Sequence, residues 1–251
     1  MRGLLAARVV AALVLATLTL SACGATPSAG ARPSPSAPAR VVYAAIGASE
    51  TIGVGADDRS RQAWPRVFSN DVLPRSAVLY NFGIPGATTA QALHDEVPAA
   101  VAVHPTVVTV WLNVNDLING VTAPDYEAQL RQVLRALLQG GQARVLVANT
   151  PDLAQLPAYR ACLPNAPAGG PTCVIPDAFM PTPQAVAAAV AAYNAAISDA
   201  VKLEGASLVD LNLNDSQITQ HPEWISADGF HPSTQGYAVI AKRFEDAYRR
   251  I

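Results

Sequence analysis

The chain has 251 residues, of which 51% are hydrophobic and 14% are charged. So large an apolar share excludes a disordered chain, because burying it offsets the entropy that ordering costs, and the length favours one sizeable domain. The chain has 17 Lys and Arg residues against 19 Asp and Glu residues, which gives a net charge of −2. No basic stripe appears along the sequence, so we expect no nucleic-acid partner.

The first 22 residues have the layout of a secretory signal. Two arginines flank the start of the chain, and the apolar run 9–20 is shorter than the roughly 20 residues that a membrane span requires. The motif Leu20-Ser21-Ala22-Cys23 resembles the lipoprotein box of bacteria, in which the cysteine is acylated and becomes the new N-terminus. We therefore expect an extracytoplasmic protein that is held on the bacterial cell membrane by a lipid on Cys23. The alternative is a soluble secreted protein that is cut near the same place.

The residues after Cys23 predict a tether. Positions 24–39 contain only Ala, Pro, Ser, Gly and Thr with one Arg. Such a stretch is too poor in large apolar groups to pack and too rich in proline for a helix. We predict a lipidated cysteine and tether over 23–39, and one folded domain over 40–251.

Short valine-rich runs recur along this domain and predict strands at 41–46, 77–80, 106–112, 144–148 and 207–211. Between them, apolar residues repeat with helical spacing, and one such stripe predicts a helix over 124–138. Further helices are predicted around 62–72, 89–103, 186–201 and 237–251, the last with Ser233 as its N-cap. Strands that alternate with helices indicate a three-layer α/β/α sandwich around a mostly parallel five-stranded sheet.

The stretch 151–183 is rich in proline and carries two further cysteines, Cys162 and Cys173. In an oxidising compartment we expect them to form a disulfide that closes a short loop, rather than to stay as two buried thiols. The stretch leaves the carboxyl end of the fourth predicted strand, so it forms either one wall of the substrate pocket or a surface excursion without contact to substrate. Neither cysteine has zinc-like spacing to a histidine, so no metal site is predicted.

Motifs with polar residues or glycines follow the first three predicted strands, where ligands of parallel sheets bind. The first motif is Gly47-Ala48-Ser49, the second contains Gly86 and the third contains Asn115. A serine at such a turn exposes its hydroxyl, a glycine lets the backbone approach a ligand, and a side-chain amide donates to an oxyanion. Each motif taken alone also fits an ordinary turn or helix cap.

The fourth motif, Asp228-Gly229-Phe230-His231, follows the last predicted strand and is the strongest single pattern. Asp and His three residues apart on one turn can meet, so that the carboxylate orients the imidazole toward a nucleophile. The other histidines, His94, His104 and His221, lack such a partner spacing, and we assign them ordinary surface or satisfied roles.

Taken together and in this order, the four motifs resemble those of the SGNH hydrolases, also called the GDSL esterase/lipase family. The resemblance covers residues 41 to about 248, apart from the stretch 151–183, and implies a flavodoxin-like SGNH hydrolase fold. It implies that Ser49 is the nucleophile and that Asp228 and His231 complete a catalytic triad. It also places Gly86 and Asn115 in the oxyanion hole.

The sequence departs from the family's pattern at two places. Ala48 stands where the family usually has Asp, so a carboxylate that normally helps to hold the nucleophile turn is absent. Asn113-Val114 stands where the third motif commonly has glycines. Neither change removes a group that performs the chemistry, but both bear on the geometry and pace of the reaction.

The resemblance implies a serine esterase that hydrolyses carboxylic esters through an acyl-enzyme on Ser49. The substrate is a lipid, an acylated glycan of the cell envelope or a small ester. The backbone N–H groups of Ser49 and Gly86 and the amide of Asn115 are expected to hold the oxyanion. We expect no metal or organic cofactor, and a monomer. Two alternatives stay open: an acyltransferase that uses the same residues, and a non-catalytic ligand-binding lipoprotein, which only the missing Asp at position 48 favours.

Overall fold

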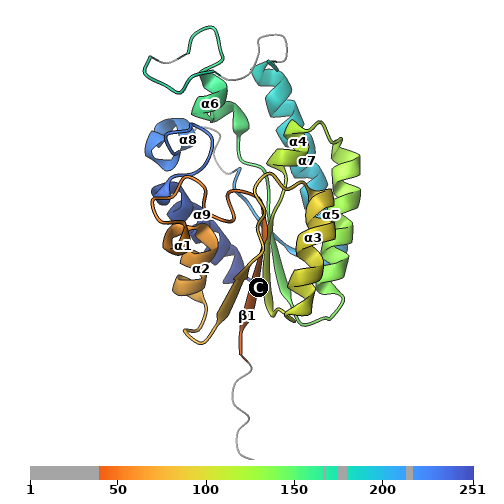
Figure 1. The fold of residues 1–251 in the computed structure, drawn as a ribbon. Coiled ribbons are helices and arrows are strands. Elements are labelled where there is room, and N and C mark those ends of the chain that lie inside the picture. Colours follow the sequence, from red (N-terminus) through yellow and green to blue (C-terminus); the bar gives the residue numbers. More distant parts are fainter. Residues whose placement is uncertain (1–39, 167, 174–179, 213–216) are drawn as a thin grey trace, which may run out of the picture. The chain divides into compact units, whose positions relative to one another are not determined.

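Five parallel strands form the sheet of the computed structural model, which describes residues 40–166, 168–173, 180–212 and 217–251 (Figure 1). The strands are β1 (Val42–Gly47), β2 (Val78–Asn81), β3 (Val107–Trp111), β4 (Arg144–Ala148) and β5 (Ser207–Val209). They lie in the flavodoxin-like order β2-β1-β3-β4-β5, and every neighbouring pair is parallel. The predicted secretory signal, lipidated Cys23 and tether fall within 1–39, outside the described residues, and stay predictions.

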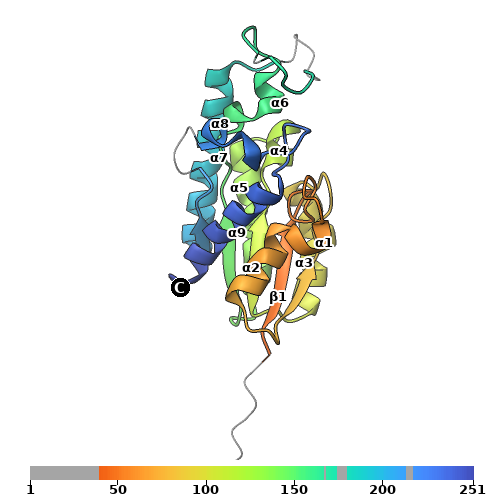
Figure 2. The same ribbon diagram turned by 90° about the vertical axis from the view of Figure 1, so that its left-hand side faces the viewer.

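Helices cover both faces of this sheet, which confirms the predicted three-layer fold (Figures 1 and 2). One face carries α3 (Thr89–Ala102), α5 (Ala123–Leu138) and α7 (Pro183–Glu204). The other face carries α1 (Arg59–Gln62), α2 (Trp64–Val72) and α9 (Thr234–Tyr248). The helix predicted around 62–72 is α2, and α1 is a separate short helix that precedes it and was not predicted. The last helix ends at Tyr248, before Ile251.

Side chains that alternate along β1 build a separate core on each face of the sheet. Ala44 and Ile46 pack with the apolar stripes of α5 and α7, whereas Tyr43 and Ala45 pack with the aromatic residues of α2 and α9. On the second face the rings of Trp64 and Phe244 stack with their centroids 4.1 Å apart. Burial on both faces explains why β1 and β3 are continuous apolar runs rather than alternating ones.

Threonine and serine side chains begin the long helices. Thr88, Thr122 and Thr182 each accept a hydrogen bond from a backbone N–H of the first turn, and the predicted cap Ser233 accepts one from Gly236. Helix α7 is long and apolar enough to cross a membrane by length and composition alone. Its residues from Tyr193 to Val201 nevertheless contribute to the core beneath the sheet, as expected for a core helix.

Short elements above the carboxyl edge of the sheet were not predicted from the sequence. They are α4 (Val114–Ile118), η1 (Leu153–Gln155), α6 (Pro157–Arg160), α8 (Gln217–Gln220) and η3 (Pro222–Trp224). They are too short to show a helical period, but Val114, Leu153, Leu156 and Tyr159 form a third apolar cluster with the start of α7. Figure 1 shows α6 and α8 beyond the strand ends, which is where the sequence motifs gather.

Candidate active site

Three of the predicted residues, from opposite ends of the domain, form a hydrogen-bonded chain at the carboxyl edge of the sheet. Ser49 lies in the turn after β1, and its Oγ is 3.0 Å from Nε2 of His231. The other ring nitrogen of His231, Nδ1, is 2.7 Å from Oδ2 of Asp228. The imidazole therefore joins a hydroxyl to a carboxylate across 182 residues of sequence, which is the arrangement that activates a serine nucleophile.

Hydrogen bonds within its own turn keep Asp228 ionised. Its Oδ1 accepts hydrogen bonds from the Ser226 hydroxyl at 2.8 Å and from the backbone N–H groups of Phe230 at 2.8 Å and His231 at 2.9 Å. Partial burial raises the pKa of Asp228, but these hydrogen bonds and the one with the His231 ring outweigh it and lower the pKa to about 2. The carboxylate is thus ionised at neutral pH and can accept a hydrogen bond only from a protonated Nδ1 of the His231 ring.

The turn after β2 presents an unused backbone donor. Gly86 has a φ of +80°, a conformation that favours glycine, and a Cβ placed on it would meet no atom within 4 Å. Conformation rather than space therefore favours glycine here. Within the described part of the chain, the N–H groups of Gly86 and Ser49 have no hydrogen-bond acceptor, so both are available to a ligand.

Asn115 lies in α4, directly after β3, and links this loop to the turn after β2. Its side-chain Nδ2 donates to the carbonyl of Ala87 at 3.0 Å, which orients the amide and leaves its second N–H for another acceptor. The amide does not cap α4, whose N-cap is Asn113. Because β1 lies between β2 and β3, the nucleophile turn is flanked by the loops that carry Gly86 and Asn115.

A buried carboxylate, Asp116, fastens these two loops together. It accepts hydrogen bonds from the Thr89 backbone N–H at 3.0 Å and from the Thr89 hydroxyl at 3.1 Å, at the first residue of α3. The segment from Gly86 to α3 is thereby tied to the loop that carries Asn115. Asp116 directly follows Asn115 in the sequence, but nothing in its spacing identified the partner 27 residues away.

A second buried carboxyl group, on Glu96 of α3, holds the start of the nucleophile turn. Its Oε2 accepts a hydrogen bond from the N–H of Gly47 at 2.8 Å, and the residue is only 1% exposed. A Cβ on Gly47 would collide with Oγ1 of Thr51 and lie 2.8 Å from the backbone oxygen of Trp111, so only glycine fits. Burial raises the pKa of Glu96 to about 8, although the Gly47 N–H lowers it. The turn that lacks the family's Asp at position 48 is held instead by a carboxyl group from another element.

A third carboxyl group missed by the sequence analysis, that of Glu50, contacts the nucleophile itself. Oε2 of Glu50 is 3.3 Å from Oγ of Ser49, and the residue is 9% exposed. Burial raises the pKa of Glu50, against the lowering effects of its own N–H, the His231 ring and the Ser49 hydroxyl. Its position beside the serine was the only signal in the sequence.

Glu50 also borders a largely apolar cavity of about 110 Å³. Phe230 and Pro232, the neighbours of His231 in the chain, contribute to the wall, together with Trp111, Leu153 and Ile240. The start of the stretch 151–183 therefore lines a cavity next to the Ser49-His231 pair, while Arg243 and Asp152 supply charged groups to its lining.

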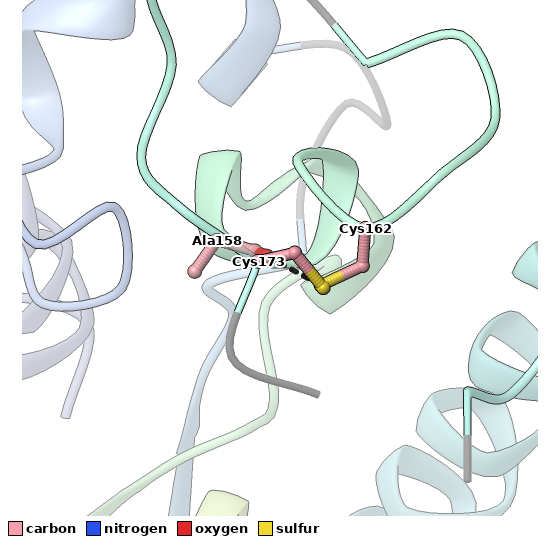
Figure 3. The surroundings of a disulfide bond; sticks show 3 residues. All are labelled: Ala158, Cys162 and Cys173. Carbon is pink, nitrogen blue, oxygen red and sulfur yellow. Dashed lines mark hydrogen bonds between the residues drawn. A yellow bond between two sulfur atoms is a disulfide. The ribbon is translucent and has the colours of Figure 1, made fainter. Parts of the chain in front are cut away.

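The stretch 151–183 also contacts the catalytic turn directly. The predicted disulfide is present, with Cys162 and Cys173 joined at an S–S distance of 2.00 Å, beside Ala158 (Figure 3). The N–H of Ala158 donates to the carbonyl of Gly229 at 2.9 Å, and a Cβ on Gly229 would lie 2.7 Å from Cγ of Pro171. Ala158, which precedes the disulfide-closed loop, and Pro171, which lies within it, thus pack against the turn that presents His231.

The other histidines lie away from this chain of hydrogen bonds. His94 is exposed beside Asp95, and His221 stacks on Trp224 and contacts Glu223 at 2.9 Å. In the portions of the chain that the structure describes, no group of three or more His, Cys, Asp or Glu side chains is arranged to hold a metal ion.

Comparisons with known proteins identify a family and a fold for this chain. A model of the GDSL-like lipase/acylhydrolase family matches residues 45–239. A comparison with curated proteins finds no match.

Solved structures with the same fold include three esterases and lipases. A psychrotrophic esterase from Pseudoalteromonas sp., in a structure inhibited by monoethylphosphonate, is 16% identical with a TM-score of 0.59 over 83% of this chain and 97% of that one. A lipase/acylhydrolase from Enterococcus faecalis is 17% identical, with a TM-score of 0.57 over 82% and 94% of the two chains. A lipase from a goat rumen metagenome is 15% identical, with a TM-score of 0.60 over 82% and 97%.

Burial of Glu96 predicts a pH-dependent stability. Between its ordinary pKa of 4.5 and about 8, the folded protein keeps a proton that the unfolded chain loses, so the free energy of unfolding falls as the pH rises. Glu96→Gln keeps an acceptor for Gly47 but cannot ionise. In the wild type, Glu96 makes the free energy of unfolding fall by at most about 1.4 kcal/mol per pH unit, and we expect this contribution to be absent in the variant. Urea unfolding of both proteins across this pH range measures the effect, and equal slopes would contradict it.

Contact between the disulfide-bonded stretch and Gly229 predicts that the disulfide supports catalysis. Replacing both Cys162 and Cys173 by Ser removes a cross-link worth about 3 kcal/mol in the chain-entropy model and loosens the packing on the catalytic turn. We expect kcat/KM to fall about tenfold, since small misplacements of reacting groups are costly. Ester hydrolysis is measured well below the unfolding temperature of the double variant. Unchanged kcat/KM in the folded variant would show that the turn needs no such support.

Proposed function

The chain belongs to the GDSL-like lipase/acylhydrolase family, whose model spans residues 45–239, and it is a carboxylic ester hydrolase; within that activity we propose that it works through an acyl-enzyme on Ser49. The observation that carries this proposal is the hydrogen-bonded chain from Ser49 through His231 to Asp228, with distances of 3.0 and 2.7 Å. These distances lie within the range over which a base can take the proton of a serine hydroxyl.

In the first step, Oγ of Ser49 attacks the carbonyl carbon of the ester while its proton moves to Nε2 of His231. The carbonyl electrons move to oxygen, which gives a tetrahedral oxyanion. Asp228 stabilises the imidazolium through Nδ1 and stays ionised, in keeping with its lowered pKa. Collapse of the intermediate expels the alcohol, which takes the proton from His231, and leaves the acyl group on Ser49.

The oxyanion is held by groups from three neighbouring loops. The backbone N–H groups of Ser49 and Gly86 are free within the described residues, and the Asn115 amide has a second N–H to give. Contacts of Asp116 and Glu96 hold these loops before substrate arrives, so little reorganisation is needed during the reaction. In the second step, His231 takes a proton from the water that attacks the acyl-enzyme and returns this proton to Oγ of Ser49 as the acid leaves.

Hydrolysis of a series of p-nitrophenyl esters of increasing acyl length tests this mechanism. We expect Ser49→Ala and His231→Ala to lower kcat/KM by about 10,000-fold or more, because the triad acts as a unit. We expect Asn115→Ala to lower kcat by about 100- to 1,000-fold, the usual effect of losing one oxyanion donor. The apolar cavity beside Glu50 and Phe230 favours aliphatic acyl groups as the first to test.

His94→Ala is the matched control, because His94 is exposed and lies outside the site. It is expected to keep wild-type turnover. A phosphonate ester provides an independent check, since it should label wild-type protein at Ser49 and leave Ser49→Ala unlabelled. Wild-type turnover in a folded Ser49→Ala protein would exclude Ser49 as the nucleophile.

We also propose that the enzyme acts outside the cytoplasm, held on the membrane by a lipid on Cys23. Support comes from the residues around Cys23 and from the Cys162–Cys173 disulfide, which suits an oxidising compartment. We expect the protein of producing cells to be found in the membrane fraction, and the Cys23→Ser variant to lose this attachment. A wild-type chain recovered entirely in the soluble extracytoplasmic fraction would instead favour the cleaved, secreted form.

A further inference from the structure

The nucleophile has two acceptors beside it rather than one. Oγ of Ser49 lies 3.0 Å from Nε2 of His231 and 3.3 Å from Oε2 of Glu50. The second distance exceeds the usual range for an O–H···O hydrogen bond, so His231 remains the preferred acceptor of the hydroxyl proton. Glu50 is therefore a second and more distant acceptor beside the nucleophile.

The surroundings of Glu50 make that charge effective. The side chain lies in the wall of the apolar cavity and is shielded from water, so its field is weakly screened. Attraction between Glu50 and His231 works in both directions. Burial raises the pKa of Glu50 above its ordinary value, and the His231 ring offsets part of this rise, because a protonated ring favours the ionised carboxylate. The ionised carboxylate in turn favours the protonated ring.

Other ionisable groups also face Glu50. Tyr237 of α9 is buried nearby, and its pKa is raised by burial and further by Glu50, so it stays neutral. Arg243 of α9 and Asp152 of the loop after β4 line the same cavity and carry opposite charges. Among these groups, the Glu50 carboxyl contacts Ser49. Replacing Glu50 therefore isolates the influence of a charge beside the nucleophile.

We propose that Glu50 is a catalytic residue whose carboxylate stabilises the imidazolium that forms when His231 takes the proton from Ser49. No proton is transferred to Glu50: the proton moves from Oγ to Nε2, Oγ bonds to the carbonyl carbon, and the carbonyl electrons move to oxygen. Glu50 lowers the energy of the charge that appears on the ring, as Asp228 does from the other nitrogen. This inference rests on the proposed function of Ser49 and His231.

The test is the pH dependence of kcat/KM for Glu50→Gln, which keeps the shape of the side chain and removes its charge. Because an imidazole without its neighbouring negative charge holds a proton less tightly, the acid limb of the profile should move to lower pH by about one unit. We expect kcat at the pH optimum to fall about tenfold, with little change in KM. Glu50→Asp keeps the charge and should retain an acid limb close to that of the wild type.

Glu96→Gln is the matched control, since it replaces another buried carboxyl group, on α3, that contacts the N–H of Gly47 but neither Ser49 nor His231. Its acid limb should stay in place. A Glu50→Gln protein that folds, as judged by thermal unfolding, but shows an unmoved acid limb or a higher kcat would overturn the proposal. If Glu50→Gln does not fold, the test depends on Glu50→Asp. An acid limb of this variant that lies about one pH unit below that of the wild type would then overturn the proposal. Loss of activity in Ser49→Ala with no shift in Glu50→Gln would leave the proposed function standing and refute only the role of Glu50.

Discussion

Parallel strands bring all their carboxyl ends to one edge of the sheet, and the serine nucleophile and the proposed oxyanion donors depend on that constraint. The strand order adds a second restriction, because β1 lies between β2 and β3. A serine after β1 is therefore flanked by the loops that supply an N–H from Gly86 and an amide from Asn115. The base has to come from elsewhere, and it arrives on the turn that leads into α9, near the end of the chain.

Carboxyl groups hold this edge together, and each does so by accepting hydrogen bonds from backbone N–H groups. Glu96 holds Gly47, Asp116 holds Thr89, and Asp228 holds the turn of His231. Loops at a strand edge leave backbone donors unpaired, so such acceptors both satisfy these donors and set the loop shape. The loss of an Asp at position 48 is thus no sign of a decayed site, because the neighbouring Gly47 is held by a side chain from α3.

Predictions from the sequence succeeded wherever the signal was local. Valine-rich runs and helical stripes located all five strands and the long helices, and Ser233 was recognised as a cap because capping involves residues three apart. Asp228 and His231 were paired for the same reason. The contacts of Glu96 and Glu50 were missed, since the first spans 49 residues and the second has no spacing pattern beyond the position of Glu50 next to Ser49. The contact of Pro171 with Gly229 likewise depends on tertiary packing, which leaves no periodic pattern in the chain.

Opposite the catalytic edge, the turn that joins α5 to β4 has no part in any of these contacts. Its residues 139–142 are exposed, and a Cβ on either Gly140 or Gly141 would meet no atom within 4 Å. Loop insertions are tolerated best at such tips, far from buried backbone. This turn is accordingly a suitable attachment point on the enzyme. A peptide tag or a link to a solid support placed there would leave the entrance of the active site open to bulky esters.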